Sequence, residues 1–167
     1  TQGTTTSSCV YGSKITLVAT PDDTHTFVGW YSDPNCEGSA ITTSSSYDIT
    51  VDNDTKDNYY AKFEYKQKTI TIDISKTSDN TVSERWAAYV WNTAENKSYW
   101  IDIKNNTFTV SLYYDKLIIC RMNGSKTEND WSNCWNQTPE TGYEISKGSK
   151  FTSTGWGTGN LINGTWK

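Results

Sequence analysis

The sequence predicts an all-β chain, in which a β-sandwich of jelly-roll or immunoglobulin-like type follows a small β-rich module. β-branched and aromatic residues are plentiful among the 167 residues, whereas Leu, Met and Ala are scarce, and this composition favours strands over helices. No stretch shows sustained helical periodicity. Short apolar runs alternate with Asn, Gly and Asp turns at close spacing, which is typical of a sandwich.

The composition changes near residues 65–68, so we expect a small β-rich repeat or spacer module at 1–66 and the sandwich at 67–167. Turn-rich segments separate the strands expected in the first module, which are 14–19, 26–31, 46–51 and 59–65. The strands expected in the second module are 69–74, 86–91, 100–103, 107–112, 116–122 and 142–145, with a closing piece at 165–167.

Two features of the second module give more detail. Asn105 and Asn106 lie between two apolar runs and suit a tight hairpin turn. The most apolar run, Leu117–Ile118–Ile119, is expected to form a buried central strand.

The first module contains four short motifs. They read YGSKITL from Tyr11, Ala-Thr-Pro from Ala19, FVGWY from Phe27 and YYAKFE from Tyr59. Through them, residues 10–65 resemble the divergent form of the internalin B-type bacterial repeat. The resemblance implies a short β-rich spacer of a secreted or surface protein. Trp30 stands between Gly and Tyr in an apolar strand, and we expect it to fill the small core.

Tryptophan is the most informative residue type, because seven of the eight tryptophans lie after Ser83. A small core cannot hide so many rings, and flat rings at the surface suit the faces of sugars or nucleobases. The net charge is −4, the pI is near 4.9 and the lysines are scattered, so the basic face that nucleic acids require is missing. A neutral, ring-shaped ligand such as a carbohydrate remains.

The segment 86–91 places its rings on a defined face, since side chains two apart in a strand point the same way. Tyr89 and Trp91 therefore share one face, and the small Ala88 and Val90 share the other, which suits a packed interior. Trp100 follows a turn later and is expected beside them on the adjacent strand. The alternative is that these aromatic rings simply pack in the core.

The remaining candidates flank this strand in the sequence. Gln137 lies in a loop after Trp135 and is the candidate for hydrogen bonds to sugar hydroxyls. We expect Trp86 to be buried on the face opposite Tyr89. We expect Trp131 and Trp135 to hold the long loop onto the sandwich, and we expect Trp156 to be buried.

The second module closely resembles carbohydrate-binding module family 26 over residues 69–167. The matching stretches are RWAAYVW from Arg85, Trp100, IICRMN from Ile118, Asp130–Trp131, WNQT from Trp135 and GTW from Gly164. The resemblance implies a β-sandwich that binds α-1,4-glucans, namely starch and maltooligosaccharides. It also implies that Tyr89, Trp91 and Trp100 stack on glucose rings and that Gln137 bonds the hydroxyl groups.

No pattern indicates catalysis. The chain has one histidine, His25, and no spacing singles out a pair of carboxylates or a nucleophilic triad. The run Asp52–Asn53–Asp54 lacks the full ligand spacing of a calcium loop. We therefore expect a non-enzymatic part or partner of a larger amylolytic protein, without catalytic residues, metal or cofactor.

The setting follows from composition and cysteine usage. No apolar run reaches membrane-spanning length, and the chain is expected to be a monomer that begins after a secretion signal or is an internal piece of a secreted or cell-surface bacterial protein. Four cysteines allow three pairing schemes, of which the local one, Cys9 with Cys36 and Cys120 with Cys134, is the simplest; four reduced thiols are the alternative. The alternative function is a structural or adhesive tandem that binds a protein partner.

Overall fold

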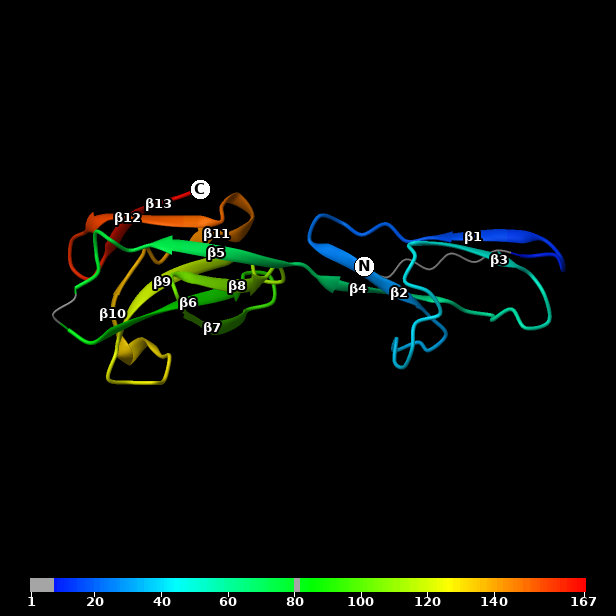
Figure 1. Cartoon of the computed structure of the whole chain (residues 1–167), viewed down its shortest axis with the longest axis horizontal. Helices are drawn as coiled ribbons and strands as arrows, with labels where there is room; N and C mark the ends of the chain where they lie inside the picture. The colour runs from blue at the N-terminus through cyan, green and yellow to red at the C-terminus, as the bar shows by residue number, and fades with distance from the viewer. Residues whose placement is uncertain (1–7, 80–81) are drawn as a thin grey trace. The chain divides into compact units, whose positions relative to one another are not determined.

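The computed structural model describes residues 8–79 and 82–167. The chain folds into two compact units, Thr1–Tyr65 and Lys66–Lys167. The described residues are almost entirely in strands, turns and loops, with two short 3₁₀ segments (Figure 1), so the prediction of an all-β chain is confirmed. Within the described residues, no helix is both long and apolar enough to cross a membrane.

The first unit consists of two antiparallel strand pairs. β1 (Lys14–Val18) pairs with β3 (Ser46–Thr50), and β2 (His25–Tyr31) pairs with β4 (Tyr60–Tyr65). Its buried side chains include Trp30, 8% exposed, with Tyr31 and Ile49. The predicted core position of Trp30 is therefore confirmed.

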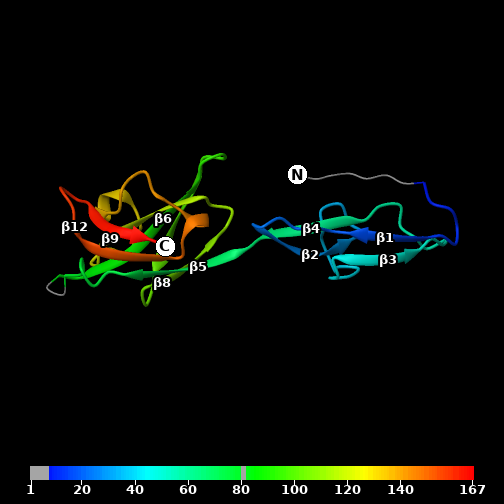
Figure 2. The same cartoon turned by 90° about the horizontal axis from the view of Figure 1, so that it is seen from above.

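The second unit is a sandwich of two sheets. The strands of the first sheet, in the order β13-β12-β5-β8, are Ile162–Trp166, Lys150–Trp156, Gln67–Asp73 and Thr107–Ser111. The strands of the second sheet, in the order β10-β9-β6-β7, are Cys134–Gln137, Lys116–Asn123, Glu84–Asn92 and Lys97–Ile103, with the short β11 (Tyr143–Glu144) on β9. All pairings are antiparallel except that of β5 with β12. Figures 1 and 2 show these sheets from two directions.

Aliphatic and aromatic side chains from both sheets fill the space between them. The cluster consists of Ile70, Ile72, Trp86, Ala88, Val90, Phe108, Val110, Leu117, Ile119, Ile145, Phe151 and Ile162. Trp86 is 7% exposed, as predicted for a core position. The predicted buried central strand is β9, which lies between β10 and β6. We call the side of β6, β7, β9 and β10 that faces this core the inner face, and the opposite side the outer face.

The hairpin between β7 and β8 confirms the predicted turn. Asn105 and Asn106 both have positive φ angles, 51° and 59°, and Lys104 and Thr107 exchange backbone hydrogen bonds. Asparagine tolerates this left-handed conformation better than most residues do, which is why Asn-rich turns close hairpins.

Two strands, β10 and β12, lie outside the predicted set, and the predicted strand 142–145 is only the two residues of β11 followed by the 3₁₀ segment η2 (Ile145–Lys147). Both missed strands have few apolar residues. In β12 only Phe151 and Ser153 are buried, and β10 has no fully buried residue. Their pairing with β5 and β9 makes them strands, and composition alone does not reveal such pairing.

The cysteines follow the reduced alternative. Cys36, Cys120 and Cys134 have free thiols, so neither of the two simplest pairings is present as a disulfide in the described part of the chain.

Candidate ligand-binding site

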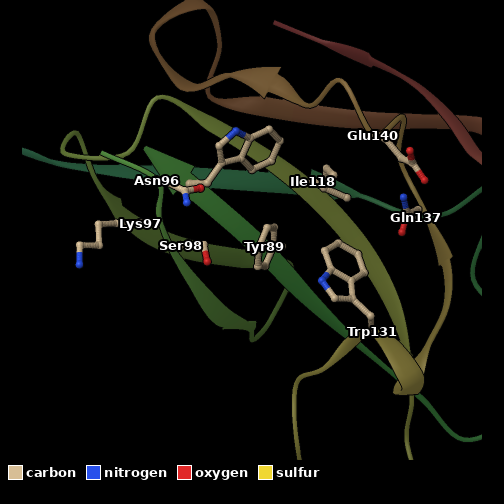
Figure 3. A pocket seen from close by; sticks show the side chains of 9 residues that line it. Tyr89, Asn96, Lys97, Ser98, Ile118, Trp131, Gln137 and Glu140 are labelled. Carbon is tan, nitrogen blue, oxygen red and sulfur yellow. The ribbon is translucent and has the colours of Figure 1, made fainter. Parts of the chain in front are cut away.

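A pocket of about 370 Å³ lies on the outer face of the β10-β9-β6-β7 sheet (Figure 3). The residues that line it are Tyr89, Trp91, Asn96, Lys97, Ser98, Ile118, Trp131, Gln137 and Glu140. Three of the four predicted site residues, Tyr89, Trp91 and Gln137, are in this set. The fourth, Trp100, is not a lining residue but contacts two of them, Tyr89 and Trp131.

The alternation of β6 creates this arrangement. Ala88 and Val90 are completely buried on the inner face, whereas Tyr89 and Trp91 are half-buried on the outer face. The strand register then sets the neighbours of Tyr89, because Trp100 of β7 and Ile118 of β9 lie directly opposite it on either side. The floor of the pocket is therefore aromatic and apolar; residues of β6 and β9 form it, and Trp100 of β7 supports it from the side.

Four rings form an aromatic cluster, defined here as Tyr89, Trp91, Trp100 and Trp131. The centroids of Tyr89, Trp100 and Trp131 are each 4.9 Å from the other two, with interplanar angles of 59° to 62°. Tyr89 and Trp91 are 6.0 Å apart at 34°. Inclined contacts of this kind stabilise aromatic pairs by about 0.5–1.5 kcal/mol beyond the burial of area. The rings therefore hold one another in place, and Trp100 supports Tyr89 and Trp131.

Trp131 was not among the predicted site residues, yet its ring forms one wall of the pocket and is 46% exposed. It begins the 3₁₀ segment η1 (Trp131–Asn133), which Asp130 caps by accepting hydrogen bonds from the backbone N–H of Asn133 (3.1 Å) and the hydroxyl of Ser132 (2.6 Å). The bond from Ser132, together with backbone N–H groups, holds the pKa of Asp130 below its ordinary value. The ring is thus carried by a capped turn.

Arg85 fixes the loop that leads to Trp131. Its guanidinium donates to the carbonyl oxygens of Lys126 (2.7 Å) and Glu128 (2.5 Å) and to the side-chain oxygen of Asn129. The amide of Asn129 donates in turn to Asp102 on β7 (2.8 Å). Because Arg85 and Tyr89 point to the same face of β6, the strand that provides the floor also anchors the loop that carries the wall.

Gln137 is positioned by its backbone and by its neighbour. Its N–H donates to the carbonyl of Asn160 (2.9 Å). The next residue, Thr138, is completely buried, and it exchanges hydrogen bonds with Ile119 through its N–H and its hydroxyl (3.0 Å each). This anchoring brings the Gln137 side chain to the pocket, beside Trp131 (Figure 3).

The edge of the Trp91 ring lies against Gly142. A Cβ atom at position 142 would be 2.3 Å from Cη2 of Trp91, and the φ of Gly142 is +66°. Only glycine meets both conditions without strain. This close approach fixes the position of the ring, and the glycine is a site feature that the sequence analysis missed.

Polar side chains surround the apolar floor. Asn96, Lys97 and Ser98 of the β6–β7 hairpin lie on one side of Tyr89, and Gln137 and Glu140 lie on the other (Figure 3). The rim therefore offers both hydrogen-bond donors and acceptors, whereas the floor offers ring faces. Such a site suits a neutral ligand with an apolar face and many hydroxyl groups.

The other two loop tryptophans lie away from the pocket. The guanidinium carbon of Arg121 is 5.2 Å from the ring centroid of Trp135 and 5.3 Å from that of Trp156. Arg121 itself is 8% exposed and pairs with Glu84 at 2.5 Å. Trp156 is 47% exposed, so the prediction that it is buried is wrong: it is the last residue of β12 and lies outside the core cluster.

Comparison with known proteins finds a match for the first unit. No curated protein and no solved structure matches the chain. Residues 1–67 match the family model described as "Divergent InlB B-repeat domain", a type of repeat that occurs in bacterial surface proteins. This part of the chain is thus similar to a β-rich bacterial repeat domain, as the YGSKITL and FVGWY motifs indicated.

Proposed function

We propose that the second unit is a non-catalytic carbohydrate-binding module that binds α-1,4-glucans, that is, starch and maltooligosaccharides. The observation that carries the proposal is that Tyr89, Trp91 and Gln137 meet at one pocket on the outer face of the second sheet. Ring faces provide stacking surfaces for the apolar faces of glucose, and the amide of Gln137 provides both a donor and an acceptor for hydroxyl groups.

The inclination of the rings favours a curved ligand. The planes of Tyr89 and Trp91 differ by 34°, so two sugar rings stacked on them would be rotated relative to each other. An α-1,4-linked glucan curves in this way from one unit to the next, whereas a β-1,4-linked glucan is a flat ribbon. The cluster is therefore better suited to starch than to cellulose.

The small size of the pocket limits the affinity that we expect. A shallow site of about 370 Å³ has room for few sugar units, so we expect micromolar to millimolar affinity, about −4 to −8 kcal/mol. We further propose that the chain acts as a monomer, within a larger amylolytic protein that is secreted by a bacterium or held at its surface. The similarity of residues 1–67 to a repeat found in bacterial surface proteins supports this location.

The test is calorimetric titration with maltoheptaose and, separately, with cellohexaose. We expect saturable heat from the first and none from the second. Equal responses to both, or no response to either, would contradict the assignment. If a protein partner binds the chain instead, maltoheptaose should fail to displace it.

Replacement of Gln137 by Ala examines the polar part of the site. Loss of one hydrogen bond costs about 1 kcal/mol, so maltoheptaose should bind about fivefold more weakly. Gln67→Ala on β5 is the matched control, because Gln67 does not line this pocket. A Gln137→Ala variant with the affinity of the parent would remove Gln137 from the site.

A further inference from the structure

Cys120 and Cys134 meet beneath the aromatic cluster. Cys120 is completely buried on β9, and Cys134 is the half-buried first residue of β10. Cys120 belongs to a buried apolar cluster with Ala87, Ile118 and Met122, and Cys134 packs against this cluster together with Trp91 and Trp100. The two thiols are close enough for each to shift the pKa of the other.

The strand register explains why the thiols meet. Cys134 is opposite Met122, and Gln137 is opposite Cys120, with a register shift between Cys134 and Asn136. Cys134 is thus a diagonal neighbour of Cys120 on the same face of the sheet. The register shift between Cys134 and Asn136 leaves the backbone of β10 less constrained by its ladder than a regular strand would be. This freedom allows the backbone to adjust so that the two sulfur atoms reach the S–S bond length of about 2.05 Å.

We propose that Cys120 and Cys134 are a disulfide-forming pair, and that their bond closes the loop that carries Trp131. The segment between them contains the Arg85-anchored loop and η1, and Gln137 follows three residues after Cys134. A bond at this place would fasten both the wall and the polar edge of the pocket to β9. The proposal concerns the linkage alone and does not depend on which ligand the pocket takes.

The surroundings of the two thiols assign their roles in the oxidation. The hydrogen bond with Cys120 holds the pKa of Cys134 below its ordinary value, while the same hydrogen bond and burial raise the pKa of Cys120. The more exposed Cys134 therefore provides the attacking thiolate. It attacks a small disulfide such as glutathione disulfide, forms a mixed disulfide and releases one glutathione thiolate, which takes up a proton from water.

Cys120 then completes the reaction. Its sulfur attacks the Cys134 sulfur of the mixed disulfide, the Cys120 proton passes to the departing glutathione thiolate, and the Cys120–Cys134 bond forms. Over both steps the protein loses two electrons and two protons, and one glutathione disulfide becomes two glutathione thiols.

The linkage is tested by peptide mapping of the full chain after incubation with glutathione disulfide. Free thiols are alkylated and the protein is cleaved with trypsin. We expect one species that joins the peptide 117–121 to the peptide 127–147, which separates into the two peptides on reduction. If the two peptides remain separate, or if the 127–147 peptide joins a peptide containing Cys9 or Cys36, the proposal is overturned.

Thermal unfolding gives a second readout that uses no ligand, so a failure of the glucan assignment leaves it intact. Closing a loop of about 15 residues should raise the Tm of the second unit on the order of 10 °C relative to the reduced protein. Cys134→Ser should abolish this difference, and the double variant Cys9→Ser, Cys36→Ser should retain it. Cys134 is the position to replace, because a hydroxyl at the buried position 120 would itself destabilise the fold. Equal Tm values for the oxidised and reduced parent chain would contradict the proposal.

Discussion

The two faces of β6 belong to one regular strand but differ in how far their aromatic side chains are buried. On the inner face, Trp86 is 7% exposed and packs with Ala88 and Val90 against the first sheet. On the outer face, Tyr89 and Trp91 are half-buried and are joined by Trp131 from a loop. The first sheet covers the inner face, whereas aromatic side chains and the loop that carries Trp131 cover part of the outer face. An aromatic residue on β6 therefore serves the core or the surface according to what lies opposite it.

The greatest loss of stability is expected from a change on the inner face. Trp86→Ala removes a buried indole from the core, and such truncations cost about 3–5 kcal/mol of unfolding free energy. Urea denaturation followed by circular dichroism would measure it as a large decrease of the midpoint at unchanged slope. A loss of less than about 1 kcal/mol would mean that the inner face is not the core of the second unit.

Trp91→Ala is the matched change on the outer face of the same strand. Under the proposed function it removes a stacking surface, so we expect maltoheptaose affinity to fall by about 2 kcal/mol or more, about 30-fold. Calorimetric titration measures this loss. Because Trp91 is only half-buried, Trp91→Ala should lower the unfolding free energy of the protein by less than Trp86→Ala does. If Trp91→Ala unfolds the protein instead, Trp91 belongs to the core, and the outer face of β6 contributes to stability as the inner face does.

Trp131→Ala extends the test to a ring that reaches the outer face from a loop and not from β6. Loss of one partly exposed stacking ring should weaken maltoheptaose binding by about 1.4 kcal/mol, about tenfold. Trp156→Ala is the control: Trp156 is exposed to the same extent, 47%, and does not line the pocket. Equal losses for the two variants would argue against a specific role for Trp131.

The weakest effect we expect is a pH dependence on the inner face. Burial opposes ionisation of Glu84, but hydrogen bonds from Ser78, Arg121 and the backbone of Asp79 outweigh it and hold the pKa of Glu84 below its ordinary value of 4.5. A depressed carboxyl pKa stabilises the folded state above the unfolded pKa, and this contribution disappears as the pH falls through the folded pKa. Unfolding free energy should therefore decline below about pH 4.5.

Glu84→Gln provides the check on this prediction. Urea denaturation at several pH values should show a shallower acid decline for the variant than for the parent chain. The same slope in both proteins would mean that another group causes the decline.

Local alternation made much of the site predictable. Tyr89 and Trp91 had to share a face, and the small Ala88 and Val90 indicated which face would be buried. Gln137 was a candidate because of its amide in the loop after Trp135 and because of the resemblance of that loop, and the structure brings it to the same pocket. The role of Gly142 was not predictable, because its contact with Trp91 joins residues that are far apart in the sequence.

The tryptophans of the loops were less predictable, since their surroundings depend on contacts between distant segments. Trp131 reaches the pocket because Arg85 and Asp102 anchor its loop to two strands. Trp156 remains exposed because it is the last residue of β12 and lies outside the core cluster, with Arg121 against its ring. Strands β10 and β12 were missed for the same reason, because pairing and not composition makes them strands.

The sequence alone was enough to predict the all-β class, the Asn–Asn hairpin, the buried central strand and the division of β6 into an apolar and an aromatic face. These depend on local preferences of backbone and side chain, which act over two to four residues. The three-dimensional structure was needed to learn which rings share a pocket, which tryptophan supports the others and which thiols meet. Those relations are set by strand register and loop anchoring, which join residues that lie tens of positions apart.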